Sequence, residues 1–458
     1  MRARPRLPAV PALVLAVAAL VPARVAAQAP EAASVTIDVL ETPSERTLLG
    51  VSFPTATAGY AVGDQGVILA TTDGGATWKE QASGVPGIDP TCNTGPGGEP
   101  IESTCTNALF DVDFVDATTG WAVGSDGIVL HTGDGGTTWA RQPLPSLDSI
   151  AGLGPGPGGT DLRPSGWDDL FSVSFPDPRA GAVAGPGGTI LVTADGGATW
   201  QWRGDRRYGG LTELTFADRH NGQAVGLATT GLSPYISVAT ADGGTSWELR
   251  QPPPRSTVAN ANFSGVDFLD AERGYIAGST GRILATTDAG HTWVVQRSDT
   301  TETFQDIAFG NEKRGLAVGA TDFNGASRAS LAVTGDGGET WAPRLLDGLI
   351  LWAVDFATPT TAYAVGCTRQ TRVERSSGPI FPCAQSLVAR ITFPAEAEAV
   401  AGEAGGDQPR PGPADGDGDG DELSVDGGSG VSLVLWVGAG AVALVAMAAL
   451  AVRRPRRH

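Results

Sequence analysis

Positive charge is scarce in this 458-residue sequence relative to negative charge. Lys and Arg together number 31 against 50 Asp and Glu, which gives a formal net charge of −19. The basic residues are almost all Arg, with Lys79 and Lys313 as the exceptions. Nucleic-acid-binding proteins use basic stripes that release counterions from phosphates, and this sequence has none. The composition therefore argues against nucleic acid as the partner.

Cysteine is also rare, with four residues in the chain. They fall into two local pairs, Cys92 with Cys105 and Cys367 with Cys383. In an exported protein an even, locally paired count predicts two disulfide bonds, each closing one long loop. Zinc binding is disfavoured because neither pair has C-x-x-C spacing and no histidine lies nearby. We expect no metal and no other cofactor.

One repeated unit dominates the rest of the chain, and it is best seen from Phe110 to Trp139. Three apolar runs of four to six residues, separated by Gly and Asp turns, predict three β-strands, and the Trp opens a fourth. Four short strands with a fixed turn signature are typical of one β-propeller blade, and a period of about 45 residues fits that architecture.

Three marks of this unit recur in step along the chain. The ending Asp-Gly-Gly-x-Thr-Trp, with small variants, spans Asp73 to Trp78, Asp134 to Trp139, Asp195 to Trp200, Asp242 to Trp247, Asp288 to Trp293 and Asp336 to Trp341. An inner-strand Phe recurs as Phe53, Phe114, Phe175, Phe216, Phe268, Phe309 and Phe356. The second-strand glycines follow in step as Gly63, Gly124, Gly185, Gly226, Gly278, Gly319 and Gly366. Seven Phe marks against six endings predict an all-β, seven-bladed propeller whose last blade is incomplete.

The repeated ending is an Asp box, and we expect its role to be structural. The Asp carboxylate can accept backbone N–H groups across its own turn, while the glycines allow positive φ angles. We expect the Trp to wedge between blades and to direct its indole N–H at a carbonyl. A metal or catalytic role is disfavoured, because a residue needed once for chemistry would not recur in six blades.

The N-terminus has the features of an export signal that ends near Ala29. Basic residues precede an apolar run at 13–21, and residues 27–29 form a small-x-small cleavage site. Residues 35–40 then alternate between apolar and polar side chains, which predicts a spare strand. This strand can fill the vacant outer position of the seventh blade and close the ring. The alternative is a disordered leader.

The C-terminal part begins with a segment that cannot form a core. Residues 395–430 consist largely of Gly, Pro, Ala and acidic residues without any aromatic side chain, which predicts a disordered spacer. Within it, Asp415 to Gly420 resembles the start of a calcium loop. The twelfth position is Asp426 rather than Glu, so we favour a solvated linker.

An uncharged segment at 431–452 follows, and it is long enough to cross a bilayer. The basic tail at 453–458 predicts that the C-terminus lies in the cytoplasm. We therefore expect a single-pass type I protein of the cell membrane, with its propeller on the extracytoplasmic side. The alternative is a C-terminal sorting signal that is cut and replaced by an anchor.

The predicted organisation is a signal peptide at 1–29, a propeller at 30–394, a linker at 395–430, a transmembrane helix at 431–452 and a tail at 453–458. The predicted blades lie at about 48–81, 109–142, 170–203, 211–250, 263–297, 304–344 and 350–393, the last completed by the strand at 35–40.

Long connections gather at one face of the predicted propeller. The insertions at 81–107, 142–168, 227–234, 320–327 and 367–383 all join two blades or the second and third strands of one blade. Long loops on a rigid scaffold are where binding sites collect. Arginines with the same placement are candidate binding residues: Arg141, Arg203, Arg206, Arg207, Arg250, Arg255, Arg282, Arg297 and Arg344. They either form a basic arc for a partner or pair with the abundant acids.

The unit Val-x-Phe, Gly-Trp-Ala-Val-Gly, Asp-Gly-Gly-x-Thr-Trp closely resembles the photosystem II assembly and stability factor family of Asp-box (BNR) propellers over about residues 48–393. This resemblance implies a non-enzymatic role in which an arginine patch engages photosystem proteins, so the expected partner is a protein, such as a member of a membrane-protein complex. The alternative for a non-photosynthetic bacterium is a surface receptor built on the same propeller.

Sialidases carry similar boxes, so a glycan-binding protein or a sialidase-like glycoside hydrolase is the alternative function. Sialidases need an arginine triad, a Tyr nucleophile with a Glu partner, and a Phe/Tyr-Arg-Ile-Pro start, and no such start occurs here. With 5 Tyr in the chain, no convincing nucleophile pair can be named. Box-bearing xyloglucanases use two propellers around a cleft, whereas this chain has one. We therefore predict no catalytic residue.

Overall fold

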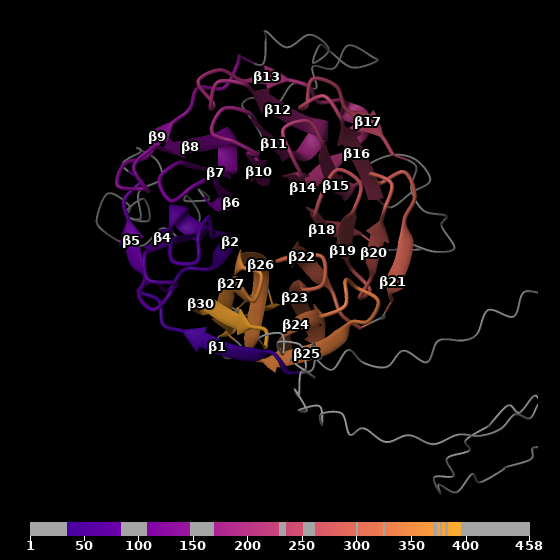
Figure 1. Cartoon of the computed structure of the whole chain (residues 1–458). Coiled ribbons are helices and arrows are strands. Elements are labelled where there is room, and N and C mark those ends of the chain that lie inside the picture. The colour runs from indigo at the N-terminus through magenta and orange to yellow at the C-terminus, as the bar shows by residue number, and fades with distance from the viewer. Residues whose placement is uncertain are drawn as a thin grey trace, which may run out of the picture. The chain divides into compact units, whose positions relative to one another are not determined.

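The computed structural model describes residues 34–83, 108–146, 169–228, 235–250, 262–298, 301–323, 326–369, 373–375, 378–380 and 383–394. Within them, seven four-stranded antiparallel sheets surround a central axis (Figure 1). This arrangement confirms the prediction of an all-β, seven-bladed propeller. The predicted signal peptide, linker, transmembrane helix and tail lie outside the described residues.

The first six blades have their strands in chain order from the axis outwards. Blades one to three are β2 (Leu48–Ser52), β3 (Gly59–Gly63), β4 (Ile68–Thr71) and β5 (Lys79–Gln81); β6 (Leu109–Phe114), β7 (Gly120–Gly124), β8 (Ile128–Thr132) and β9 (Ala140–Arg141); and β10 (Ser172–Ser174), β11 (Gly181–Gly185), β12 (Thr189–Thr193) and β13 (Gln201–Trp202). Blades four to six are β14 (Gly210–Phe216), β15 (Gly222–Leu227), β16 (Tyr235–Thr240) and β17 (Glu248–Leu249); β18 (Phe263–Phe268), β19 (Gly274–Gly278), β20 (Ile283–Thr286) and β21 (Val294–Arg297); and β22 (Phe304–Phe309), β23 (Gly315–Phe323), β24 (Ala326–Thr334) and β25 (Ala342–Asp347).

Blade seven is built from both ends of the propeller. Its inner strands are β26 (Leu349–Thr358), β27 (Thr361–Arg369) and β30 (Cys383–Thr392), and the short hairpin of β28 (Val373–Arg375) and β29 (Gly378–Ile380) lies between the last two in sequence. The outer strand is β1 (Thr36–Leu40), which pairs antiparallel with β30 from Thr36↔Thr392 to Leu40↔Val388. Figure 1 shows β1 along the outside of β30. The N-terminal strand therefore closes the ring.

The hydrophobic core lies between neighbouring blades rather than inside them. At the first interface, the ring of Tyr60 from β3 stacks on Phe114 at the end of β6, with centroids 3.5 Å apart. Gly120 lies opposite Phe114, and a Cβ there would lie 2.4 Å from the Phe ring. This close approach explains why a residue without a large side chain faces Phe114.

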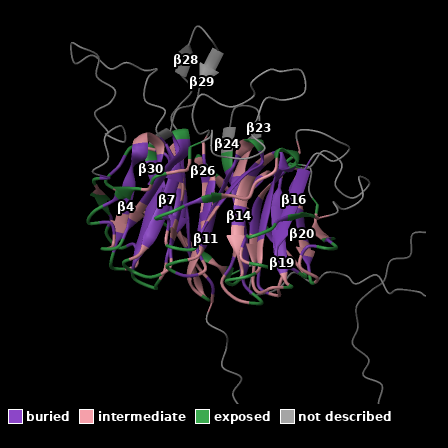
Figure 2. Ribbon diagram, turned by 90° about the horizontal axis from the view of Figure 1, so that it is seen from above, coloured by how far each residue is buried: buried purple, intermediate pink, exposed green. Residues whose placement is uncertain are grey.

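The strands run between two faces of the ring, which we name by their turns. The loop face carries the connections between blades and the turns from second to third strands, and the box face carries the Asp boxes. Figure 2 shows buried residues along the strands and exposed residues in the turns at both faces. The strand β1 begins and β30 ends at the box face. Within the described ranges, no helix has the length and apolar character needed to span a membrane.

Candidate functional site

Every Asp box forms the same hydrogen-bonded turn. In the first box, the hydroxyl and the backbone N–H of Thr77 donate to the Asp73 carboxylate at 2.6 and 2.8 Å, and the hydroxyl of Thr71 donates at 2.8 Å. These bonds, the Thr77 hydroxyl above all, lower the pKa of Asp73 to about 2. The carboxylate is therefore occupied within its own turn. Sequence analysis missed the threonine that ends each third strand: Thr71, Thr132, Thr193, Thr240, Thr286 and Thr334.

The box tryptophans pack between blades, as their apolar surface requires, but the expected indole bond is wrong for most of them. The ring of Trp139 is 6% exposed and meets Phe114 edge-on at 5.8 Å. Among the described residues, the indole N–H has no partner in five boxes: Trp78, Trp139, Trp200, Trp247 and Trp293. In three boxes an aromatic side chain of the preceding blade donates a hydrogen bond to a glycine carbonyl of the box. The hydroxyl of Tyr363, for example, donates to the Gly74 carbonyl at 2.6 Å. The sixth tryptophan, Trp341, donates to the Gln296 side chain at 3.3 Å.

Most of the candidate arginines lie at the ends of the outer strands of blades two to six or just after them, and Figure 1 places these strands around the rim of the ring. Arg282 lies instead in the turn between β19 and β20. Arg141 ends β9, Arg297 ends β21 and Arg344 lies within β25. Arg206 and Arg207 lie in η6 (Arg206–Tyr208), a short turn between blades three and four, whereas Arg255 lies outside the described residues. The structure therefore spreads the arginines over several blades instead of gathering them in one patch.

Among the candidate arginines that the structure describes, three are exposed. Arg141 and Arg206 are exposed, and neither has a side-chain partner in the described part of the chain. The side chain of Arg207 is 75% exposed and pairs with Asp205 at 2.6 Å. Together these three residues, on the connections that leave blades two and three, are the part of the predicted arc that a partner can reach.

Arg297 does not belong to an exposed arc. Its side chain is 10% exposed, forms an ion pair with Glu302, whose side chain is 5% exposed, and lies over the ring of Phe304 at 5.3 Å. This pair joins the end of blade five to the start of blade six. The nearby Arg282 donates to the Thr280 hydroxyl at 3.2 Å. The position of Arg297 at a strand end suggested exposure, and the inward direction of its side chain overturns that inference.

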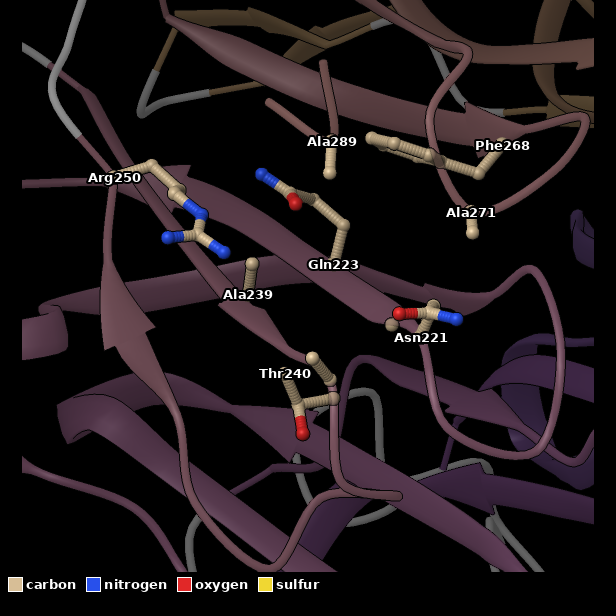
Figure 3. Close-up of a pocket in the computed structure, with 10 residues that line it drawn as sticks. Asn221, Gln223, Ala239, Thr240, Arg250, Phe268, Ala271 and Ala289 are labelled. Atoms are coloured by element: carbon tan, nitrogen blue, oxygen red, sulfur yellow. The ribbon is translucent and has the colours of Figure 1, made fainter. Parts of the chain in front are cut away.

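Arg250 also points inward, into a cavity of about 30 Å³ between blades four and five (Figure 3). Its side chain is 13% exposed and pairs with Glu248 at 3.2 Å. Gln223 stands here at the second-strand position where Tyr60, Trp121, Tyr275 and Tyr363 fill other interfaces. The smaller Gln223 leaves the space that the Arg250 guanidinium partly occupies.

Two further arginines bond to their own strands. Arg203 donates to the Gln201 side chain at 2.5 Å and to the Trp202 carbonyl at 3.2 Å. Arg344 donates to the Pro343 carbonyl at 3.0 Å. The ordinary pairing that the sequence left open therefore accounts for much of the predicted arc.

Sequence analysis missed a second site, the axial channel where the inner strands of all seven blades meet. A cavity of about 180 Å³ lies there, lined by residues of β2, β6, β10, β14, β18, β22 and β26. Six carboxyl groups face it: Asp111, Asp113, Glu213, Asp267, Asp306 and Asp355. Its lining contains no Lys, Arg or His. No group of three or more His, Cys, Asp or Glu residues that could hold a metal occurs in the described ranges.

Side chains in this channel join each blade to the next one. Each inner strand exposes backbone N–H groups towards the preceding blade, and a Ser, Asp or Glu of that blade accepts one of them. The acceptors and donors are Ser52 with Phe114, Asp113 with Phe175, Ser174 with Phe216, Glu213 with Val266, Asp267 with Phe309, Asp306 with Val354 and Asp355 with Phe53, at 2.6 to 3.1 Å. All seven blade interfaces therefore carry such a bond in the same direction around the ring.

Burial shifts the titration of these channel carboxyls upwards. It raises the pKa of Asp113 and Asp267 to about 7 and that of Asp111 to about 6, and the backbone bonds oppose the shift only in part. Glu213 and Asp306 are hydrogen-bonded to each other, and burial followed by the neighbouring charge raises the pKa of Glu213. Desolvation dominates because no cation compensates the charges.

The structure describes a cysteine side chain from one of the two predicted disulfide pairs. Cys367 on β27 is buried and disulfide-bonded. Cys92, Cys105 and the side chain of Cys383 lie outside the described residues, so the pairing within each loop stays a prediction.

Comparison with known sequences connects this repeat to one family. The chain matches the family described as "Photosynthesis system II assembly factor YCF48" at residues 29–89, 98–151 and 205–298. The photosystem II assembly protein Ycf48 of Synechococcus sp. strain JA-2-3B'a(2-13) is 24% identical over 327 residues, covering 59% of this chain and 94% of the relative. The chloroplastic stability/assembly factor HCF136 of Arabidopsis thaliana is 24% identical over 143 residues, covering 31% of this chain and 27% of the relative.

Solved structures share the fold. A structure titled "YCF48 bound to D1 peptide" has a TM-score of 0.51 and 18% identity, covering 78% of this chain and 96% of its own. YCF48 from Cyanidioschyzon merolae has a TM-score of 0.52 and 17% identity, and the match covers 77% of this chain and 98% of the YCF48 chain. The six Asp boxes, the seven blades and these matches make the chain similar to the photosystem II assembly factor-like family of Asp-box propellers.

Proposed function

We propose that this chain is a non-enzymatic, membrane-anchored propeller outside the cytoplasm that binds a protein partner through its loop face, as a scaffold or assembly factor. The observation that carries the proposal is the exposed arginine set Arg141, Arg206 and Arg207 on the loop face of an acidic body. The kinship with assembly factors supports a protein partner, and the relative whose structure holds a D1 peptide supports a peptide segment as the element bound.

The charges of the box face support this choice. The box face carries the six box aspartates together with Asp116, Asp218, Asp270, Glu272 and Glu312. Its basic residues are largely neutralised, since Arg219 pairs with Asp177 at 2.9 Å and Arg273 with both Asp270 and Glu312 at 2.7 Å. Unlike charges steer association, so an acidic segment of a partner would approach the loop face.

The alternative of a sialidase-like enzyme has little support in the structure. All five tyrosines of the chain are buried: Tyr60, Tyr208, Tyr235, Tyr275 and Tyr363. The hydroxyl of Tyr208, for example, donates to the Trp247 carbonyl at 2.7 Å. A buried tyrosine that supports the blade packing cannot reach a sugar as a nucleophile.

We expect charge reversal on the loop face to abolish partner capture. The double variant Arg141→Glu/Arg206→Glu changes two exposed side chains that make no bond in the described structure, so the fold should be retained. Its affinity for the partner should fall about tenfold or more, the equivalent of about 1.4 kcal/mol. The measurement is quantitative pull-down from the organism's own cell-envelope extract, followed by titration of the captured protein at two salt concentrations, because screening should weaken the parent interaction.

The matched control is Lys79→Glu/Arg179→Glu, which reverses two exposed charges on the box-face half. Arg314 is unsuitable as a control because it is 4% exposed and donates to the Pro394 carbonyl at 3.3 Å. The control should capture the same protein as the parent. If the control loses the partner while the loop-face variant retains it, the binding face is the box face.

Membrane attachment is expected to depend on residues 431–452. Full-length protein should remain in the membrane fraction after an alkaline carbonate wash, whereas a chain ending at residue 430 should be released. An epitope tag after His458 separates the two forms of attachment. Loss of the tag from cell-bound protein would show that the segment is processed as a sorting signal.

A further inference from the structure

The axial channel places ionisable side chains at the interfaces between blades. These side chains have no role in the proposed binding of a partner. The carboxyl groups of the channel come from five blades, and each accepts a backbone N–H of the following blade. The second strands packed behind the inner strands read Gly-Tyr-Ala-Val-Gly, Gly-Trp-Ala-Val-Gly and close variants, with no charged residue over those positions. The charged groups that face one another across the channel are therefore the six carboxyls alone.

We propose that this carboxyl ring is a proton-dependent clasp that tightens the closed propeller when it is protonated and loosens it when it is ionised. A neutral carboxyl still offers its carbonyl oxygen to the neighbouring N–H, so protonation preserves the bonds between blades. Ionisation places like charges around a cavity of about 180 Å³ whose lining contains no basic side chain, and their repulsion acts across the blade interfaces.

The Glu213–Asp306 pair shows how close these groups are. Glu213 accepts from Val266 of blade five and is also hydrogen-bonded to Asp306 of blade six. Gly265 lies between them in the ring, and a Cβ there would lie 2.8 Å from the Asp306 backbone. Two carboxyl groups can share a hydrogen bond only while one holds a proton. Full ionisation therefore breaks this contact between blades four and six.

The direction of the pH effect follows from the shifted groups. Burial raises the pKa of Asp113 and Asp267 to about 7, from an ordinary value of 3.8. Between these values the folded state binds protons that the unfolded state lacks, so the stability that these two groups contribute falls as the pH rises from about 4 to about 7 and is constant above that range. Each such carboxyl changes the folded-to-unfolded ratio by about tenfold per pH unit within that range.

The test compares thermal unfolding of the full-length protein at pH 5 and pH 7.5 with that of Asp113→Asn/Asp267→Asn. An Asn retains an oxygen for the N–H of Phe175 or Phe309 but cannot ionise. The parent Tm should fall from pH 5 to pH 7.5, and the variant should lose much of that fall. The control Asp126→Asn/Glu272→Gln removes two charges from exposed positions and should retain the parent's fall. A parent Tm that is level or rises over this range, or a variant that falls as much as the control, overturns the proposal.

Hydrogen exchange supplies a test that needs no variant. The amides of Phe175 and Phe309 donate to Asp113 and Asp267. Their protection factors, corrected for the intrinsic pH dependence of exchange, should fall between pH 5 and pH 7.5 by a larger factor than those of amides between β27 and β30. Equal pH dependence at both places would show that the carboxyls do not act at the blade interfaces.

Discussion

Deleting residues 34–40 is expected to open the propeller and lower its unfolding free energy by roughly 3–5 kcal/mol. The strand β1 pairs with β30 over five residues. Val35 and Ile37 pack partly buried against the core between blades six and seven, and Leu40 packs against the core between blades seven and one. Burial of three such side chains accounts for this magnitude. The measurement is Tm by circular dichroism. Deletion of residues 400–406, outside the propeller, removes the same length as a control.

A synthetic peptide of residues 34–41 adds a stricter test of this closure. Because β1 supplies a complete outer strand, the peptide should bind the deleted protein by strand addition and restore its Tm. An unchanged Tm after the deletion, or no response to the peptide, would contradict closure by β1.

Replacing Trp139 with Ala is expected to cost about 3–5 kcal/mol, as for other large buried aromatic side chains. The ring is 6% exposed and supports Phe114, which in turn stacks on Tyr60 of the first blade. The loss therefore reaches two blades. Equilibrium denaturation measures it. Trp139→Phe is the matched variant and should cost less, because it retains most of the apolar ring and the indole N–H has no partner in the described structure to lose. A cost below about 1 kcal/mol for the Ala variant would mean that the tryptophan does not hold the interface.

The blades could be predicted from the sequence because their repeated unit is short and depends on local contacts. The Gly and Asp turns of the box fix the hairpin between third and fourth strands, and the Phe with its facing Gly fixes the pairing of the first two. Closure by β1 could also be inferred, because a seventh Phe without a seventh box leaves one strand position vacant. These features depend on neighbours in sequence or on a count of repeats.

The direction of the arginine side chains could not be read in the same way. Arg250 and Arg297 have the same strand-end position as Arg141, yet both turn inward. The reason lies in single residues elsewhere: Gln223 leaves space for Arg250, and Glu302 offers a buried carboxylate to Arg297. Each of these contacts occurs at a single interface, so the repeated sequence pattern does not predict it.

The channel, by contrast, had a signal that was overlooked. An acid stands one residue before the inner-strand Phe as Asp113, Asp267 and Asp355, and three residues before it as Asp111, Glu213 and Asp306. Alternate residues of a strand share a face, so all six could have been placed on the axis. Their hydrogen bonds to backbone N–H groups of the following blade and their raised pKa values depend on burial, so only the structure reveals them.

The pairing of β1 with β30 also sets the order in which the molecule can be completed. The strand that is synthesised first finds its partner only after residues 383–392 have left the ribosome. Contacts between such distant parts of a chain form slowly, because the entropy cost of closing a long loop precedes the stabilisation that the contacts provide. Until then blade seven lacks its outer strand, and both β1 and β30 present unpaired edges that invite association with other chains. Closure of the ring is therefore a late event, and a chain truncated before blade seven would keep its unpaired edge permanently.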